Sequence, residues 1–210
     1  MRNHLSSTKN FLLKRNCDIH IILAYMRNCK KAVDTTIFKS SIMLMLYNEI
    51  EGTFSNILSE LFDYIIDENI DFNLLHSKIK KIYLEYYCKK TNNNVAELMS
   101  FHDNEDLKNV DYLELNKYLK LYSGNLDARQ IRDISKKIGV PISNTVDGKK
   151  LVRVKNCRNK LAHGEESFQE VCRDFSEDDI EDIAKEVFAF LDMLISDYNN
   201  FIDRQLVISH

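Results

Sequence analysis

An arginine and a histidine separated by four residues, Arg158 and His163, are the side chains best suited to chemistry in this sequence. Histidine has the ordinary pKa nearest neutral pH, so it can take up and release a proton under physiological conditions. The planar guanidinium group of arginine keeps its charge and binds phosphate oxygens through paired N–H groups. Together the two side chains predict proton transfer at a phosphodiester, which is the chemistry of RNA cleavage.

Each residue of this motif has an expected role. His163 would accept the proton of a ribose 2′-OH or donate one to the leaving 5′ oxygen. Arg158 would neutralise the charge that develops on phosphorus, and Asn159 would orient the histidine or the phosphate. The product would be a 2′,3′-cyclic phosphate, formed without a metal ion or other cofactor. Arg and His at this spacing also occur by chance, so the motif alone leaves a purely structural interpretation open.

The motif lies at the end of a helix predicted from about Lys149 to Ala162. Three apolar residues recur along it at three- and four-residue spacing, which indicates the face that docks on the core: Val154, Cys157 and Leu161. At about 100° per residue, His163 lies about 180° from Val154 and points away from the core, provided that the helix does not fray at Gly164. Arg158 lies about 140° from His163, so one ideal helix does not bring the two together. A site shared between two copies of the helix would do so.

This segment is locally basic, although the whole chain has a net charge of -3. Six cations and no carboxylate lie between Gly148 and His163: Lys149, Lys150, Arg153, Lys155, Arg158 and Lys160. Such a patch can hold a phosphate backbone, and we expect Arg153, Lys155 and Lys160 to contact the substrate. The alternative is a solvated basic face that the acidic stretch from Glu165 to Asp182 neutralises.

Glu51 is a further candidate from a distant part of the chain. It is either a solvated helix residue or a carboxylate that faces the cleft, where it would hydrogen-bond Arg158 or His163 and set its protonation. The remaining histidines are scattered without the spacing of metal ligands: His4, His20, His76, His102 and His210. We therefore expect no metal site.

Composition indicates a helical globular protein. With 210 residues the chain can bury a substantial core, and we interpret residues 1–210 as a single domain. Apolar residues make up 44%, and the presence of only five Gly and one Pro favours long helices. Five dispersed cysteines without a C-x-x-C pair indicate reduced thiols, and no apolar run approaches a membrane span. We expect a cytoplasmic protein that does not associate with membranes.

The spacing of apolar residues predicts an all-α fold. Two long helices, around residues 11–23 and 37–65, should pair antiparallel, and a third is expected at 73–88. From Thr91 to Asn125 the pattern is irregular, and Tyr112–Leu115 fits either a short strand or a helical turn.

The second half of the chain has clearer helix boundaries. A helix that begins near Ala128 should stop at Gly139, and Ser176 should cap the last helix in a capping box with Asp179. The last helix carries a long apolar stripe: Ile180, Ile183, Val187, Leu191, Leu194, Tyr198, Phe201 and Ile202. That stripe is either an internal core face or a surface that reaches a second subunit.

The run Arg158-Asn159-Lys160-Leu161-Ala162-His163-Gly164, placed before a long amphipathic helix, resembles the R-x4-6-H motif of the HEPN superfamily. The wider pattern is similar to the MAE-type HEPN-like nuclease family of bacterial conflict systems. Two more blocks carry this similarity: Lys39-Ser40-Ser41 to Tyr47-Asn48-Glu49-Ile50-Glu51, and Gly124-Asn125-Leu126-Asp127-Ala128-Arg129-Gln130-Ile131-Arg132. The resemblance extends from about Thr36 to Phe201.

The resemblance implies a HEPN-like helical bundle that forms a homodimer with a composite cleft and cleaves RNA without a metal. It also implies a role in phage defence or a toxin–antitoxin system, with an antitoxin or regulatory protein from a neighbouring gene as a candidate partner. One alternative is a catalytically inactive HEPN module that binds RNA, a nucleotide or a partner protein. Another is a plain helical scaffold in which Arg158 forms a salt bridge with the acidic segment. The sequence leaves these interpretations open.

Overall fold

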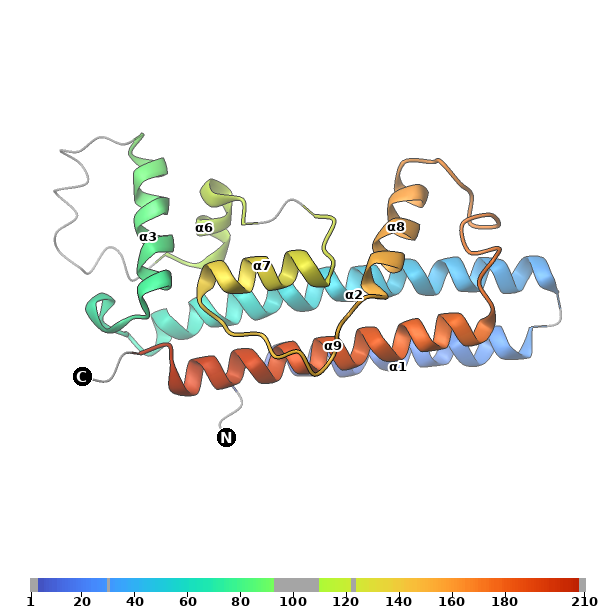
Figure 1. Cartoon of the computed structure of the whole chain (residues 1–210), viewed down its shortest axis with the longest axis horizontal. Coiled ribbons are helices and arrows are strands. Elements are labelled where there is room, and N and C mark those ends of the chain that lie inside the picture. Colours follow the sequence, from blue (N-terminus) through green and yellow to red (C-terminus); the bar gives the residue numbers. More distant parts are fainter. Residues whose placement is uncertain (1–3, 30, 93–109, 122–123, 208–210) are drawn as a thin grey trace.

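The computed structural model describes residues 4–29, 31–92, 110–121 and 124–207, and its regular structure is helical (Figure 1). Three helices are long: α1 (Ser6–Asn28), α2 (Ala32–Asp67) and α9 (Glu177–Arg204). Four are shorter: α3 (Ser77–Lys90), α6 (Tyr112–Leu119), α7 (Ala128–Ile138) and α8 (Leu151–Ala162), with a 3-10 turn, η1, at Phe72–Leu74. Within these ranges the β-type pairing is limited to an isolated bridge between Leu75 and Val207. The predicted all-α fold is confirmed.

The three long helices pack lengthwise against one another. A short connection joins α1 to α2, and the two run antiparallel as predicted (Figure 1). On α9, every residue of the predicted apolar stripe, from Ile180 to Ile202, is buried within this chain. The stripe is therefore an internal core face, and it is not a surface for a second subunit.

Helix ends follow the local signals in the sequence. The Ser176 hydroxyl accepts from the Asp179 amide at 3.0 Å and the Asp179 carboxylate accepts from the Ser176 amide at 2.9 Å, so the predicted capping box is confirmed. Gly139 ends α7 with φ at +108°, a left-handed conformation that glycine adopts without a steric penalty. Asp127 begins α7 by accepting a hydrogen bond from the Gln130 amide at 3.0 Å.

The four shorter helices lie on one side of α2, and α1 lies on the other (Figure 1). Of the four, α8 projects away from the long helices. Tyr112–Leu115 belongs to α6, whose first turn is capped by Asp111, so the helical alternative for this segment is confirmed. Residues 93–109 of the predicted irregular stretch lie outside the described residues. At its base α8 packs against α2 and α9, which fixes its direction relative to the bundle.

A carboxyl group is buried inside the long-helix bundle. Glu49 of α2 is 1% exposed, and neither carboxyl oxygen has a hydrogen-bond partner in the described structure. Burial raises the pKa of Glu49 to about 8, with Arg15 opposing this shift and Asp192 and Asp18 adding to it. The side chain is thus held in its neutral form at neutral pH.

The cysteines and the apolar character of the helices are the two remaining features for which the sequence supports an expectation. All five cysteines are free thiols, as predicted. None of the helices that the structure describes has the length and apolar character needed to cross a membrane.

Candidate functional site

The end of α8 is a defined turn. The Glu165 amide donates to the Lys160 carbonyl at 2.9 Å, and the Gly164 amide donates to the Leu161 carbonyl at 3.3 Å. With Gly164 at φ +67°, these bonds form a Schellman motif, which closes the carboxyl end of a helix. His163 is the capping residue directly before Gly164, and its side chain is exposed. The predicted outward direction of His163 is confirmed.

Arg158 is half-buried and lies over an aromatic ring. Its guanidinium carbon is 4.7 Å from the centroid of the Tyr47 ring, within the range of a cation–π interaction. Its Nη1 also donates to Oδ1 of the neighbouring Asn159 at 3.1 Å. Among the described residues, no carboxylate lies within 4.0 Å of Arg158, so the salt bridge of the scaffold interpretation is not formed. The guanidinium is positioned, and its charge is not neutralised.

Tyr47 links three separate segments at this point. The tyrosine is fully buried on α2, under Arg158 of α8, and its hydroxyl accepts from the Leu126 amide at 3.3 Å. Burial and the nearby Glu51 carboxylate raise the pKa of Tyr47, while the Leu126 amide and the Arg158 charge oppose that rise. The phenol therefore stays neutral. It joins the segment before α7, through Leu126, to α2 and α8.

Glu51 lies on the wall of the same site, half-buried and one turn from Tyr47. Its Oε1 is 3.7 Å from the point where a Cβ on Gly124 would stand, and Gly124 has φ at +79°. The carboxylate thus faces the segment between α6 and α7. No hydrogen bond or ion pair joins it to Arg158 or His163 in the described structure. It acts on this site through its charge.

The described structure records no bond between the two ends of the motif. Asn159 shares its side-chain oxygen with Arg158, and its backbone carbonyl accepts from the His163 amide at 2.9 Å. Within the part of the chain that the structure describes, neither Asn159 nor Arg158 donates a hydrogen bond to the His163 ring or accepts one from it. One chain therefore presents an Arg158–Asn159 pair and, one turn later, a separate exposed histidine.

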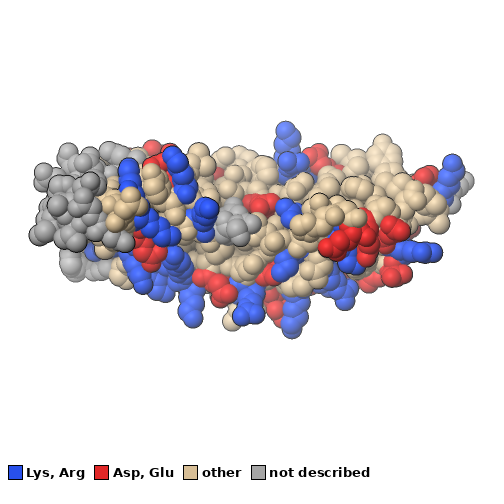
Figure 2. All heavy atoms as spheres, turned by 90° about the horizontal axis from the view of Figure 1, so that it is seen from above, with Lys and Arg blue, Asp and Glu red and all other residues tan. Residues whose placement is uncertain are grey.

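Most of the predicted basic patch is paired within the chain. Four of its cations have carboxylate partners: Lys149 with Asp147, Lys150 with Glu186, Lys155 with Asp127, and Lys160 with Glu166. Arg153 and Arg158 have none within 4.0 Å among the described residues. Of these carboxylates, Glu166 alone comes from the stretch expected to neutralise the patch. Figure 2 shows the face from which α8 projects, where acidic and basic side chains are interspersed.

The Lys155–Asp127 pair is a structural contact. Both side chains are largely buried, and Asp127 also caps α7. Burial by itself would raise the pKa of Asp127, but hydrogen bonds from Lys155 and the Gln130 amide lower it below its ordinary range. The pair ties α8 to the start of α7.

The segment that follows His163 is anchored on α2. Lys39 Nζ donates to the Phe175 carbonyl at 2.6 Å, and Ser40 Oγ donates to the Phe168 carbonyl at 2.7 Å. Sequence reasoning missed the roles of Lys39, Ser40 and Tyr47. All three residues stood within the first of the two supporting blocks, but helix periodicity does not reveal which side chains meet across two helices.

Among the described residues, no group of three or more His, Cys, Asp or Glu side chains is placed to hold a metal ion. Comparison with known protein families gives a match that spans most of the chain. A family model described as MAE_28990-like HEPN matches residues 3–206, a range that extends from the start of α1 beyond the end of α9. No curated protein and no solved structure matches the chain.

Proposed function

Because the chain belongs to the MAE_28990-like HEPN family, we propose that it is an endoribonuclease in which Arg158 and His163 cleave RNA without a metal ion. Family membership supports a nuclease-like or nucleotide-binding module. The observation that carries the nuclease proposal is the state of Arg158, which is fixed over Tyr47 and has no carboxylate partner among the described residues. A guanidinium held in this way keeps its full charge for a phosphate.

The proposed reaction divides between the two residues. Arg158, steadied by Asn159, binds the scissile phosphate and offsets the negative charge that builds up as the 2′ oxygen attacks. His163 accepts the 2′-OH proton or protonates the leaving 5′ oxygen. One exposed histidine cannot do both at once, so a second group is needed on the opposite side of the phosphate. A His163 from a second copy of the chain would supply it.

We therefore propose a homodimer whose two α8 ends line one cleft. The buried α9 stripe does not support this interface, but Phe168, in the segment after His163, is exposed. A second exposed apolar set on the outer face of α1 is the competing surface: Leu13, Ile21 and Tyr25. Figure 1 places α1 and α8 on different sides of α2, so an α1 interface would keep the two motifs apart.

Light scattering tests this assembly. We expect a dimer at micromolar concentration, weakened by Phe168→Ser and unaffected by the matched control Ile21→Ser. A monomer that RNA does not convert to a dimer would contradict the composite cleft. Dissociation by Ile21→Ser alone would move the interface to α1.

The resemblance also supports a biological setting in phage defence or a toxin–antitoxin system. In that setting an antitoxin or regulatory protein from a neighbouring gene controls the nuclease. Expression of the wild-type chain alone should then arrest growth, and co-expression of the neighbouring gene should relieve the arrest. Harmless expression with or without the neighbours would count against a toxin role.

A second candidate is a catalytically inactive HEPN module that binds RNA or a nucleotide. The described structure has no hydrogen bond between the Arg158 and His163 side chains of one chain, and this favours the inactive module. Product analysis separates the two candidates: the nuclease should cut single-stranded RNA in EDTA and leave 2′,3′-cyclic phosphate ends. Binding without cleavage would favour the inactive module, and activity that requires added Mg²⁺ or Mn²⁺ would contradict the metal-independent mechanism.

A further inference from the structure

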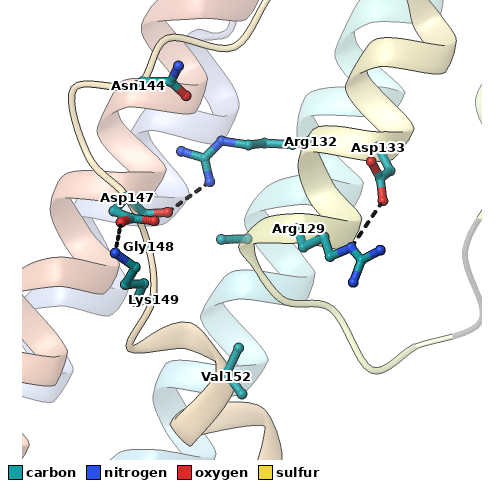
Figure 3. A pocket seen from close by; sticks show the side chains of 9 residues that line it. Arg129, Arg132, Asp133, Asn144, Asp147, Gly148, Lys149 and Val152 are labelled. Carbon is teal, nitrogen blue, oxygen red and sulfur yellow. Dashed lines mark hydrogen bonds and ion pairs between the residues drawn. The ribbon is translucent and has the colours of Figure 1, made fainter.

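A cavity of about 540 Å³ lies between the amino-terminal ends of α7 and α8 (Figure 3). Ala128, Arg129 and Arg132 of α7 form one wall, and the segment with Asp147 and Lys149 forms the other. Val152 of α8 closes the lower end as drawn in Figure 3. The cavity thus combines apolar surface from Ala128 and Val152 with three cations and two carboxylates, Asp133 and Asp147, and it lies outside the site at Arg158.

Arg132 builds one side of this cavity as a fixed charge. Its guanidinium donates to the Val146 carbonyl at 2.7 Å and to the Asp147 carbonyl at 2.8 Å, and it lies 5.0 Å from the Phe190 ring. No carboxylate lies within 4.0 Å of it among the described residues. The backbone carbonyls hold the guanidinium in place and leave its positive charge beside the cavity.

The turn at Gly148 sets the position of the other wall. Gly148 has φ at +74°, and a Cβ there would lie 2.7 Å from both Ala128 Cβ and the Phe190 ring. The segment therefore packs closely on α7 and α9, and a larger residue would push the wall outward. The cavity is bounded by well-packed elements on both sides.

Two rim cations are available for exchange with a ligand. Arg129 lies 4.0 Å from Asp133, and Lys149 lies 2.6 Å from Asp147, with all four side chains largely exposed. Exposed ion pairs contribute about 0–1 kcal/mol, so a phosphate can replace the carboxylates at little cost. The buried Lys155–Asp127 pair is different, because breaking it would leave a charge without a partner inside the protein.

The cavity and Arg158 are connected by one face of α8. Asn159, which holds Arg158, lies seven residues after Val152, which is close to two full helical turns. The two residues thus share a face and are separated by roughly 10 Å along the helix axis. A nucleic-acid strand bound at Arg158 and running along this face would reach the cavity.

We propose that this cavity binds a nucleotide of the RNA strand that flanks the nucleotide being cleaved, an inference that rests on the proposed function. The phosphate lies between Arg129 and Lys149, near the fixed charge of Arg132, and the sugar and base cover the floor at Ala128 and Val152. The cavity recognises a nucleotide phosphate, which both an RNA strand and a free nucleotide carry. The experiment therefore tests these two sources separately.

The test measures RNA binding separately from cleavage. A labelled single-stranded 12-mer RNA is titrated with the His163→Ala protein, which keeps the basic groups and should leave the RNA intact. Two further proteins carry the same His163→Ala substitution. One adds Arg129→Gln and Lys149→Gln, and the control adds Lys14→Gln on the exposed face of α1. Thermal unfolding of each protein confirms that the surface substitutions leave the fold intact.

We expect the double variant to lower the magnitude of the slope of log K against log salt by about 0.7, because one phosphate contact is lost, which is roughly fivefold weaker binding at 0.1 M salt. The control should change neither quantity. Binding that weakens with Arg158→Ala but not with the double variant would overturn the cavity proposal and leave the proposed function standing.

A free-nucleotide arm, with AMP in place of the RNA, completes the design. AMP binding that depends on Arg129 and Lys149, in a protein that does not bind RNA, would make the cavity a nucleotide site and overturn this proposal. Binding of neither RNA nor AMP would overturn both this proposal and the proposed function.

Discussion

At the scale of single residues, the state of Arg158 decides what the site can do. A carboxylate partner would hold the guanidinium in place but would cancel the charge that a phosphate needs. The Tyr47 ring holds it by a cation–π interaction instead, which contributes about 0.5–2 kcal/mol. The tyrosine thereby positions Arg158 and leaves it available for a phosphate.

Replacing Tyr47 tests this positioning role. Tyr47→Leu removes the ring under Arg158 and should weaken RNA binding roughly fivefold, as expected for a loss of about 1 kcal/mol. Tyr47→Phe keeps the ring and loses only the acceptor for the Leu126 amide, so its RNA affinity should stay close to wild type. Affinity is measured by titration of labelled RNA under conditions where both variants are folded. Equal affinity of Tyr47→Leu and wild type would show that the ring does not position Arg158.

The direction of a side chain could be predicted from the sequence where it depends on the geometry of a single helix. The outward direction of His163 follows from 100° per residue, since it needs only the positions of Val154 and Cys157 on the same helix. The partner of Arg158 could not be predicted in this way. Tyr47 meets Arg158 because α8 crosses α2 there, and the crossing depends on the packing of the whole bundle.

At the scale of elements, the end of α8 determines where His163 lies. Gly164 adopts φ +67°, and a Cβ at this position would have no atom within 4 Å, so only the backbone conformation disfavours other residues. The two hydrogen bonds of the Schellman motif depend on that conformation. The sequence predicted that the helix bearing the motif ends at about Ala162, before Gly164, and the structure confirms this helix end.

Substitution at Gly164 should separate backbone strain from steric effects. Gly164→Ala is expected to lower the free energy of unfolding by about 1 kcal/mol, because alanine is strained at positive φ. Gly164→Asn should cost less, since asparagine tolerates this conformation. Urea denaturation followed by circular dichroism measures both. If the alanine variant is as stable as wild type, the Schellman turn is not what holds the helix end.

Other elements show where the pattern of the sequence was ambiguous. The apolar stripe of α9 fitted both an internal and an intersubunit face, and only the packing against α1 and α2 decided for the internal one. The run of cations on α8 suggested a continuous patch, but carboxylates from four separate segments pair with it. Counting charges along the chain cannot locate partners that folding brings from elsewhere.

At the scale of the whole molecule, Glu49 makes the long-helix bundle sensitive to pH. Its pKa of about 8 in the folded state exceeds the ordinary value of 4.5 that it regains on unfolding. Between these values the folded protein binds more protons than the unfolded chain, so stability falls as pH rises. The contribution of Glu49 is fully present below pH 4.5 and is lost as pH rises through 8. Each unit of pKa difference corresponds to about 1.4 kcal/mol.

Glu49→Gln removes this titration and keeps the shape of the side chain. We expect the variant to unfold at a higher temperature than wild type at pH 8, where wild type must bury a charge or bind a proton. Near pH 5 the two should unfold at similar temperatures. The check is the unfolding midpoint measured across this pH range by calorimetry. If wild type and Glu49→Gln had the same unfolding midpoint at every pH, the Glu49 carboxylate would not be an unpaired buried group.

We propose that this molecule uses His163 to cleave RNA without a metal, and single-turnover cleavage in EDTA is the measurement that decides it. Wild-type protein, His163→Ala and the control His20→Ala, an exposed histidine on α1, are compared near neutral pH on one single-stranded RNA. We expect His163→Ala to bind the RNA but to cleave it about 10²–10⁴-fold more slowly, while His20→Ala matches wild type. Cleavage by His163→Ala at the wild-type rate, or intact RNA with wild-type protein even when the products of neighbouring genes are present, would contradict it.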